Sequence, residues 1–149
     1  MHVMAPRPSD PQVPTFFNVD TSVGERGSNS SVEDILLVQF LIRKVGQTAG
    51  PTLPPDRRER MLNVAPTGTC DRETIDGIRA VQETMRERHP ATIVDGKVSP
   101  ARGYQYGAAA WTIVSLNVTV RRHNLKVWPR LHELSDCPSL LKDRFPAVL

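Results

Sequence analysis

The chain has 149 residues, which is enough for one domain of ordinary size with extensions and too short for two full cores. Its net charge of +3 comes from 19 basic and 16 acidic side chains spread along the sequence without a basic stripe or a reading motif, which argues against nucleic-acid binding. Only 39% of the residues are hydrophobic and 13 are proline, so we expect a compact core with much irregular chain.

The beginning of the sequence carries no apolar run of the kind that targets a protein to a membrane. We therefore expect neither a secretory signal peptide nor a membrane-spanning helix. The protein is expected to be made in the cytoplasm and to reach its destination as part of a virion or another machine.

Residues 1–29 are predicted to form an irregular N-terminal arm. Four prolines fall within the first 14 residues, and glycine, serine and asparagine dominate residues 24–30. Phe16 and Phe17 begin the only apolar patch of this segment. These two side chains need burial, either against the parent domain or against a neighbouring subunit.

A first helix is predicted after Ser30, which forms a capping box with Glu33, and Ser31 with Asp34 offers the same box one residue later. Apolar residues then recur every three or four positions on one face, at Ile35, Val38, Leu41, Ile42 and Val45. We expect Gly46 to stop this helix. Residues 47–66 contain four prolines and are predicted to be a long insert with one short helical turn near 58–62.

A second helix is predicted to begin after Asp71, its expected N-cap. Its apolar stripe consists of Ile75, Ile78, Val81 and Met85. The pair His89-Pro90 ends it. Gly77 inside the helix costs about 1 kcal/mol relative to alanine, which predicts the close approach of another helix at that point.

Residues 111–124 fit two kinds of secondary structure, and a short insert, residues 103–110, precedes them. Apolar and polar residues alternate from Val114 to Val120, which favours a β-strand. A helical frame that places Trp111, Val114 and Val118 on one face also fits. Periodicity alone leaves both structures open.

Residues 125–149 are predicted to form a second irregular arm, punctuated by three prolines. Both arms carry large apolar side chains, too few to make a core of their own, whose exposure would sacrifice roughly 1.5 to 3 kcal/mol each. We expect these side chains to bind a partner protein. They are Phe16, Phe17, Trp128, Leu140, Leu141 and Phe145.

Three segments together carry a resemblance to a known family. They are Asp34 to Ile42 with Gln39, Thr67 to Gln82 with its turn at Gly68, and the degenerate turn Asp95-Gly96-Lys97-Val98-Ser99-Pro100. In this order they resemble the small three-helix peptidoglycan-binding domain, in which two loops of the type Asp-Gly-x-apolar-Gly-Pro-x-Thr each introduce a helix. The match covers roughly residues 31–122.

The resemblance implies a mainly α fold, with a three-helix core over residues 30–124 that carries inserts at 47–66 and 103–110. It also predicts a helix, and not a strand, over 111–122. Gly68 and Gly96 are expected to adopt positive φ in tight turns. Gln39 and Gln82 are expected to pair with backbone groups of those turns. Cys70 stands at a loop position that is apolar in the family, where it would behave as a small hydrophobe.

No catalytic motif is visible in the sequence, and the family it resembles is non-catalytic, so we expect no enzyme and no cofactor. His89, His123 and His132 are separated from one another, which predicts surface positions and no metal site. Cys70 and Cys137 lie far apart without zinc-ligand spacing, and they either pair or stay free.

The candidate ligand-binding residues are Arg102, Tyr104, Tyr106 and Trp111. Flat rings with a polar tip commonly hold sugars and peptides, and Arg102 beside them would hold a stem-peptide carboxylate by a bidentate contact. The alternative is that the rings form a hydrophobic plug under the 103–110 insert.

Two functions follow from these observations. The first is a non-catalytic structural or assembly subunit of a bacteriophage virion or tail, or of a related injection device, whose partners are other protein subunits. The second is a peptidoglycan-binding module that targets or anchors a partner hydrolase or machine to the cell wall.

Overall fold

The computed structural model describes residues 1–4, 15–48, 50–102 and 111–149, so the predicted insert at 103–110 lies outside the described residues. The helices are α1 (Val32–Thr48), α2 (Pro55–Leu62), α3 (Arg72–Arg88), α4 (Thr112–His123) and α5 (Ser139–Val148), with short 3-10 turns η1 (Gly50–Thr52) and η2 (Leu131–Glu133). The strands are β1 (His2–Met4), β2 (Phe16–Asn18), β3 (Val23–Gly24) and β4 (Lys97–Val98). The expected mainly α class is confirmed. In the described part of the chain, no helix is long and apolar enough to cross a membrane.

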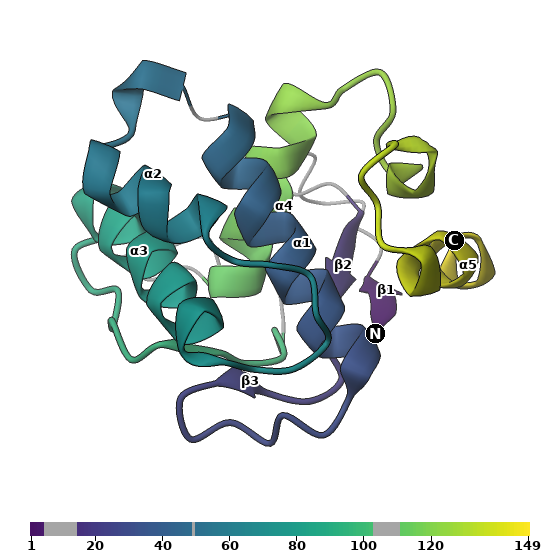
Figure 1. The fold of residues 1–149 in the computed structure, drawn as a ribbon, viewed down its shortest axis with the longest axis horizontal. Coiled ribbons are helices and arrows are strands. Elements are labelled where there is room, and N and C mark those ends of the chain that lie inside the picture. The colour runs from purple at the N-terminus through teal and green to yellow at the C-terminus, as the bar shows by residue number, and fades with distance from the viewer. Residues whose placement is uncertain (5–14, 49, 103–110) are drawn as a thin grey trace.

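α1 lies at the centre of the fold and contacts α2, α3, α4 and α5 (Figure 1). Every residue from Asp34 to Ile42 is buried, so this stretch of the helix is covered on all its faces. The helix continues to Thr48, and the predicted stop at Gly46 is therefore wrong. Gly46 instead makes room for α2, because a Cβ at this position would lie 2.9 Å from the Cβ of Met61.

The predicted insert at 47–66 folds as η1 and α2, and α2 is longer than the single turn expected. It lies along α3 in Figure 1 and is joined to it by ion pairs. The guanidinium of Arg57 is 2.6 Å from the carboxylate of Glu87, and Arg60 pairs with Glu83. These contacts make the insert part of the folded core.

Both remaining core helices lie where the sequence predicts them. Asp71 caps α3 by accepting a hydrogen bond of 2.9 Å from the backbone N–H of Thr74, and α3 ends just before His89. Residues 112–123 are helical, which confirms the helix and excludes the strand. The buried residues of α4 fit one face of a helix; they are Ile113, Val114, Leu116, Asn117 and Val120.

Gly77 marks a close approach in the core, as its position in the helix predicts. A Cβ added there would lie 2.3 Å from Cγ2 of Val64 and 3.3 Å from Cγ2 of Ile42. Val64 follows α2 and Ile42 belongs to α1, so the segment after α2 and the central helix both reach α3 at this glycine. Any larger side chain would push them apart.

Two buried glutamines hold the turns that precede α3 and α4. The amide oxygen of Gln39 accepts from the N–H of Gly68, and that of Gln82 accepts from the N–H of Gly96, both at 2.9 Å. Each amide nitrogen donates to the carbonyl of the residue after the glycine, at 2.9 and 3.0 Å. The glycines have φ of 76° and 70°, which other residues rarely adopt. The predicted glycine conformations and glutamine pairings are confirmed.

The described part of the N-terminal segment is folded into the core, which corrects the expected irregular arm over residues 1–29. β1 and β2 pair antiparallel, and Phe16 and Phe17 of β2 are 1% and 0% exposed. The side-chain amide of Asn117 in α4 accepts from the N–H of Phe17 at 2.8 Å and donates to its carbonyl at 2.9 Å. α4 thus satisfies the backbone of β2, and the two phenylalanines are buried within their own chain.

A second short pairing joins the N-terminal segment to the turn before α4. β3 and β4 are antiparallel, with Val23 opposite Val98 and both side chains buried. The amide of Asn18 accepts from the N–H of Ala101 and donates to its carbonyl, both at 3.0 Å. The segment before α1 therefore contacts both ends of the second turn.

The C-terminal segment also differs from the expected irregular arm, because it contains η2 and α5 and packs beside α1. Figure 1 shows it on the side of α1 opposite to α2 and α3. An ion pair of 2.6 Å links Lys44 to Asp136, and another of 3.1 Å links Glu33 to Arg144.

Of the six side chains expected to bind a partner, Phe16, Phe17, Leu141 and Phe145 are buried within this chain. The expectation is wrong for these four because the two terminal segments pack against each other. The ring centroids of Phe17 and Phe145 are 4.6 Å apart. Trp128 is partly buried and meets Phe17 edge-on at 5.6 Å. Leu140 remains 44% exposed.

The two cysteines are free thiols. Cys137 is buried, and Cys70 is partly buried against the core. Burial raises the pKa of both thiols, to about 11 for Cys137. Both side chains are therefore protonated near neutral pH, which agrees with the hydrophobic role expected for Cys70.

Candidate functional site

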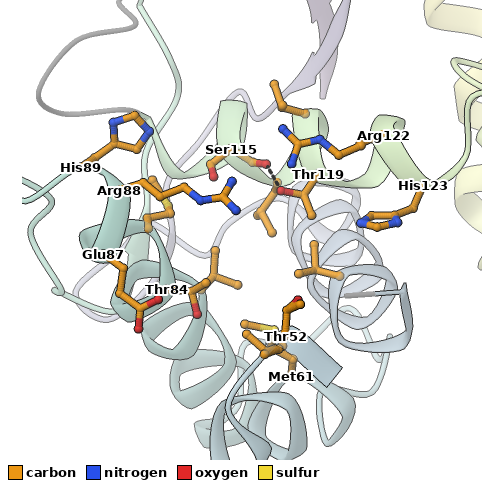
Figure 2. Close-up of a pocket in the computed structure, with 16 residues that line it drawn as sticks. Thr52, Met61, Thr84, Glu87, Arg88, His89, Ser115, Thr119, Arg122 and His123 are labelled. Carbon is orange, nitrogen blue, oxygen red and sulfur yellow. Dashed lines mark hydrogen bonds between the residues drawn. The ribbon is translucent and has the colours of Figure 1, made fainter. Parts of the chain in front are cut away.

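A groove of about 400 Å³ opens between the C-terminal halves of α3 and α4, with η1 and α2 along one side (Figure 2). Its lining residues are Val45, Thr52, Leu53, Met61, Val81, Thr84, Met85, Glu87, Arg88, His89, Ser115, Leu116, Val118, Thr119, Arg122 and His123. The volume lies within the range of small-molecule sites.

The floor of the groove is apolar. Met61, Val81, Met85 and Leu116 line it, and each is at most 5% exposed as a whole residue. These side chains belong to the apolar faces of α2, α3 and α4. The floor is therefore an extension of the hydrophobic core that a ligand can reach.

Hydroxyl groups lie above this floor on both helices. Thr84 in α3 donates to the carbonyl of Ala80, and Thr119 in α4 donates to the carbonyl of Ser115, both at 2.9 Å. Because each proton is already used within the helix, the two oxygens offer acceptor positions to a ligand.

The mouth of the groove is positively charged. Arg88 from α3 and Arg122 from α4 are both exposed, and Figure 2 shows the side chain of Arg88 extending toward α4 and that of Arg122 lying along α4. Within the described residues neither has an ion-pair partner. The nearby carboxylate of Glu87 is already engaged by Arg57 at 2.6 Å. Two uncompensated cations therefore face the opening.

The ligand-binding residues expected from the sequence lie elsewhere. Arg102 and Trp111 line a separate hollow of about 530 Å³, together with Lys97, Ser22 and Ser28. The structure thus brings Arg102 and Trp111 to one hollow but not to the groove. Tyr104 and Tyr106 lie outside the described residues.

Sequence reasoning missed the groove because its residues come from five separate elements, α1, η1, α2, α3 and α4. His89 and His123 were expected at separate surface positions, yet both line the groove. The usable signal was the clustering of basic residues in the last turns of α3 and α4. Within the described residues, no group of three His, Cys, Asp or Glu side chains could hold a metal ion.

A buried carboxylate outside the groove has a structural role. Asp34 is wholly buried, and its Oδ2 accepts hydrogen bonds from the backbone N–H groups of Asp20 and Thr21. Its Oδ1 lies 2.8 Å from the α-ammonium group of Met1. Burial alone would lower the pKa of this ammonium, but its hydrogen bonds to Asp20 and Asp34 outweigh burial and raise it. Asp34 therefore holds the N-terminal segment on α1.

Comparisons with protein-family models, with curated proteins and with solved structures found no match to the chain.

Proposed function

We propose that this protein is a non-catalytic peptidoglycan-binding module and that the groove between α3 and α4 is its binding site. The observation that carries the proposal is an apolar groove whose mouth holds two cationic side chains, Arg88 and Arg122, without ion-pair partners in the described chain. Exposed charges facing a concave apolar surface are typical of a site that orients an anionic ligand.

The two turns support the same proposal. Gln39 and Gln82 are among the residues that carry the resemblance to the peptidoglycan-binding domain, and they make equivalent hydrogen bonds in the turns before α3 and α4. A repeated arrangement of this kind is what the resemblance implies, and it supports the proposal. The groove lies between the two helices that these turns introduce.

The groove favours binding over bond cleavage. The threonine hydroxyls on its walls donate to carbonyls of their own helices, and the carboxylate of Glu87 is paired with Arg57. The lining also holds two imidazoles, His89 and His123, which Figure 2 shows on opposite sides of the groove. General base catalysis needs a carboxylate or imidazole positioned on the proton to be moved, together with a group that orients it. We therefore assign the charged rim to ligand recognition.

A second candidate is the structural or assembly subunit of a virion or injection device. It is favoured by the exposed leucines of the C-terminal segment, Leu125, Leu140 and Leu149, which are 65%, 44% and 52% exposed. A protein interface would cover exposed apolar side chains of this kind. The burial of Phe16, Phe17, Leu141 and Phe145 removes most of the apolar surface on which this candidate was based.

Co-sedimentation with purified peptidoglycan sacculi tests the proposal. We expect the wild-type protein to pellet with sacculi and Ser115→Trp, which fills the groove from α4, to stay in the supernatant. Arg121→Trp is the matched control, because it places the same ring on α4 outside the groove lining. Both variants should keep the wild-type circular dichroism spectrum and melting temperature. Absence of wild-type binding, together with self-association in light scattering, would favour the assembly subunit.

A further inference from the structure

We infer that the groove binds the carboxylate end of a short peptide between Arg88 and Arg122, so that the ligand is the peptide part of the polymer and not its sugar chain. The inference rests on the proposed function and names the chemical group that the site takes. It depends on the charge, the lining and the size of the groove.

The charge at the mouth requires an anion. Arg88 and Arg122 stand on opposite walls, and the acidic side chains nearest to them along α3, Glu83 and Glu87, are held by Arg60 and Arg57 of α2. A guanidinium group presents a planar fork that matches a carboxylate, and such charge-assisted pairs are among the stronger hydrogen bonds. Two such forks at the rim of one groove fit a terminal carboxylate.

The lining favours a peptide over a sugar. None of the described residues that line the groove is Trp, Tyr or Phe, so this described lining offers a sugar no flat aromatic ring to stack on. Instead the floor is made of flexible or branched aliphatic side chains such as Met61, Met85 and Leu116. Methionine adapts its shape to small apolar groups, and alanine methyls at the end of a peptide would contact this floor.

The size of the groove limits the ligand to the end of a chain. A volume of about 400 Å³ is near the lower end for small-molecule sites, which fits a few small residues and excludes a folded partner. The hydroxyl oxygens of Thr84 and Thr119 lie along the walls as acceptors for peptide N–H groups.

The probe is diacetyl-L-lysyl-D-alanyl-D-alanine with a free C-terminal carboxylate, compared with the same peptide ending in a carboxamide. Isothermal titration calorimetry with the full chain should detect the acid and find the amide at least tenfold weaker. Arg88→Gln and Arg122→Gln should each weaken binding of the acid by about tenfold, as expected for the loss of one charge-assisted contact. Arg121→Gln, the neighbouring arginine outside the groove, should bind as the wild type does.

Equal binding of acid and amide would overturn the inference, as would wild-type affinity in Arg88→Gln and Arg122→Gln. Loss of binding in Arg102→Gln alone would also overturn it, because that result would place the carboxylate in the other hollow.

Failure of the inference is separable from failure of the proposed function. If the protein binds sacculi through the groove but binds the acid and the amide peptides equally, the inference fails and the proposed function stands. Binding of the acid that depends on both arginines, without sacculus binding, would support the inference and refute the proposed function.

Discussion

Replacing Gly77 with alanine has two opposite effects on the stability of the fold. Alanine has the higher helix propensity, by about 1 kcal/mol, so the change would stabilise an exposed helix interior. At this position, however, the new Cβ would lie 2.3 Å from Cγ2 of Val64, a buried branched side chain. Ordinary contact between two carbon atoms is about 3.5 to 4 Å, so one of the two segments must move.

The clash should prevail over the gain in propensity. Overpacking a close-packed core costs about 1 to 3 kcal/mol, and a contact this short falls at the upper end of that range. After the propensity gain is subtracted, we expect Gly77→Ala to lower the free energy of unfolding by about 2 kcal/mol. Urea unfolding followed by circular dichroism measures this change as a lower midpoint with an unchanged slope.

A double-mutant cycle identifies the cause. Val64→Ala removes the clashing methyl and should by itself cost about 2 kcal/mol of stability through lost burial and a small cavity. In the double variant the methyl group introduced by Gly77→Ala fills part of that space and the clash is gone, so the total loss should be about 3 kcal/mol smaller than the sum of the two single losses. A stabilising Gly77→Ala variant, or losses that simply add, would refute the packing of α3 against the segment after α2.

Three further predictions concern buried polar groups. Gln82→Leu should lower the free energy of unfolding by about 2 to 4 kcal/mol in urea unfolding, because it leaves the N–H of Gly96 and the carbonyl of Lys97 buried without their partner. Asn117→Leu should lower the free energy of unfolding by a similar amount, about 2 to 4 kcal/mol. It should also raise the rate of hydrogen exchange in β2, because the backbone of this strand loses both of its bonds to the amide. Unchanged protection of β2 would contradict this prediction. Burial raises the pKa of the Cys137 thiol from 9.0 to about 11, so alkylation of the folded protein, followed by mass spectrometry, should be slow at pH 8 and accelerate toward pH 11. The stability that the buried, protonated Cys137 thiol contributes should be complete below pH 9 and should be lost as the pH rises to 11, because the unfolded chain loses this proton at a lower pH than the folded protein does.

Local rules predicted the start of α3, the two glycine turns and, for α1, the second of two serine frames, in which Ser31 accepts from the N–H of Asp34 at 3.2 Å. Asp71 caps α3 because its side chain accepts a hydrogen bond from a residue only three positions away. Gly68 and Gly96 adopt positive φ because their own turns require it. Such features depend on near neighbours in the chain, which the sequence displays directly. Gly46 was misjudged by the same rules, because what matters there is the distance to Met61 on another helix.

The candidate site could be predicted only in part. The basic last turns of α3 and α4 are visible in the sequence, but nothing local indicates that their arginines face one groove. Arg102 and Trp111 are near each other in sequence and do share a hollow, yet this hollow is separate from the groove. The groove is lined by side chains of α1, α2, α3 and α4, which only the tertiary structure brings together.

The sequence by itself determined a mainly α chain, the caps and ends of α3, and the two glycine turns held by Gln39 and Gln82. Only the tertiary structure decided where the terminal segments lie. Phe17 is buried because Asn117, 100 residues later in the chain, satisfies its backbone N–H and carbonyl. A polar backbone enters an apolar core only when its hydrogen bonds are supplied there, and the partner that supplies them is set by the fold and not by the sequence around Phe17.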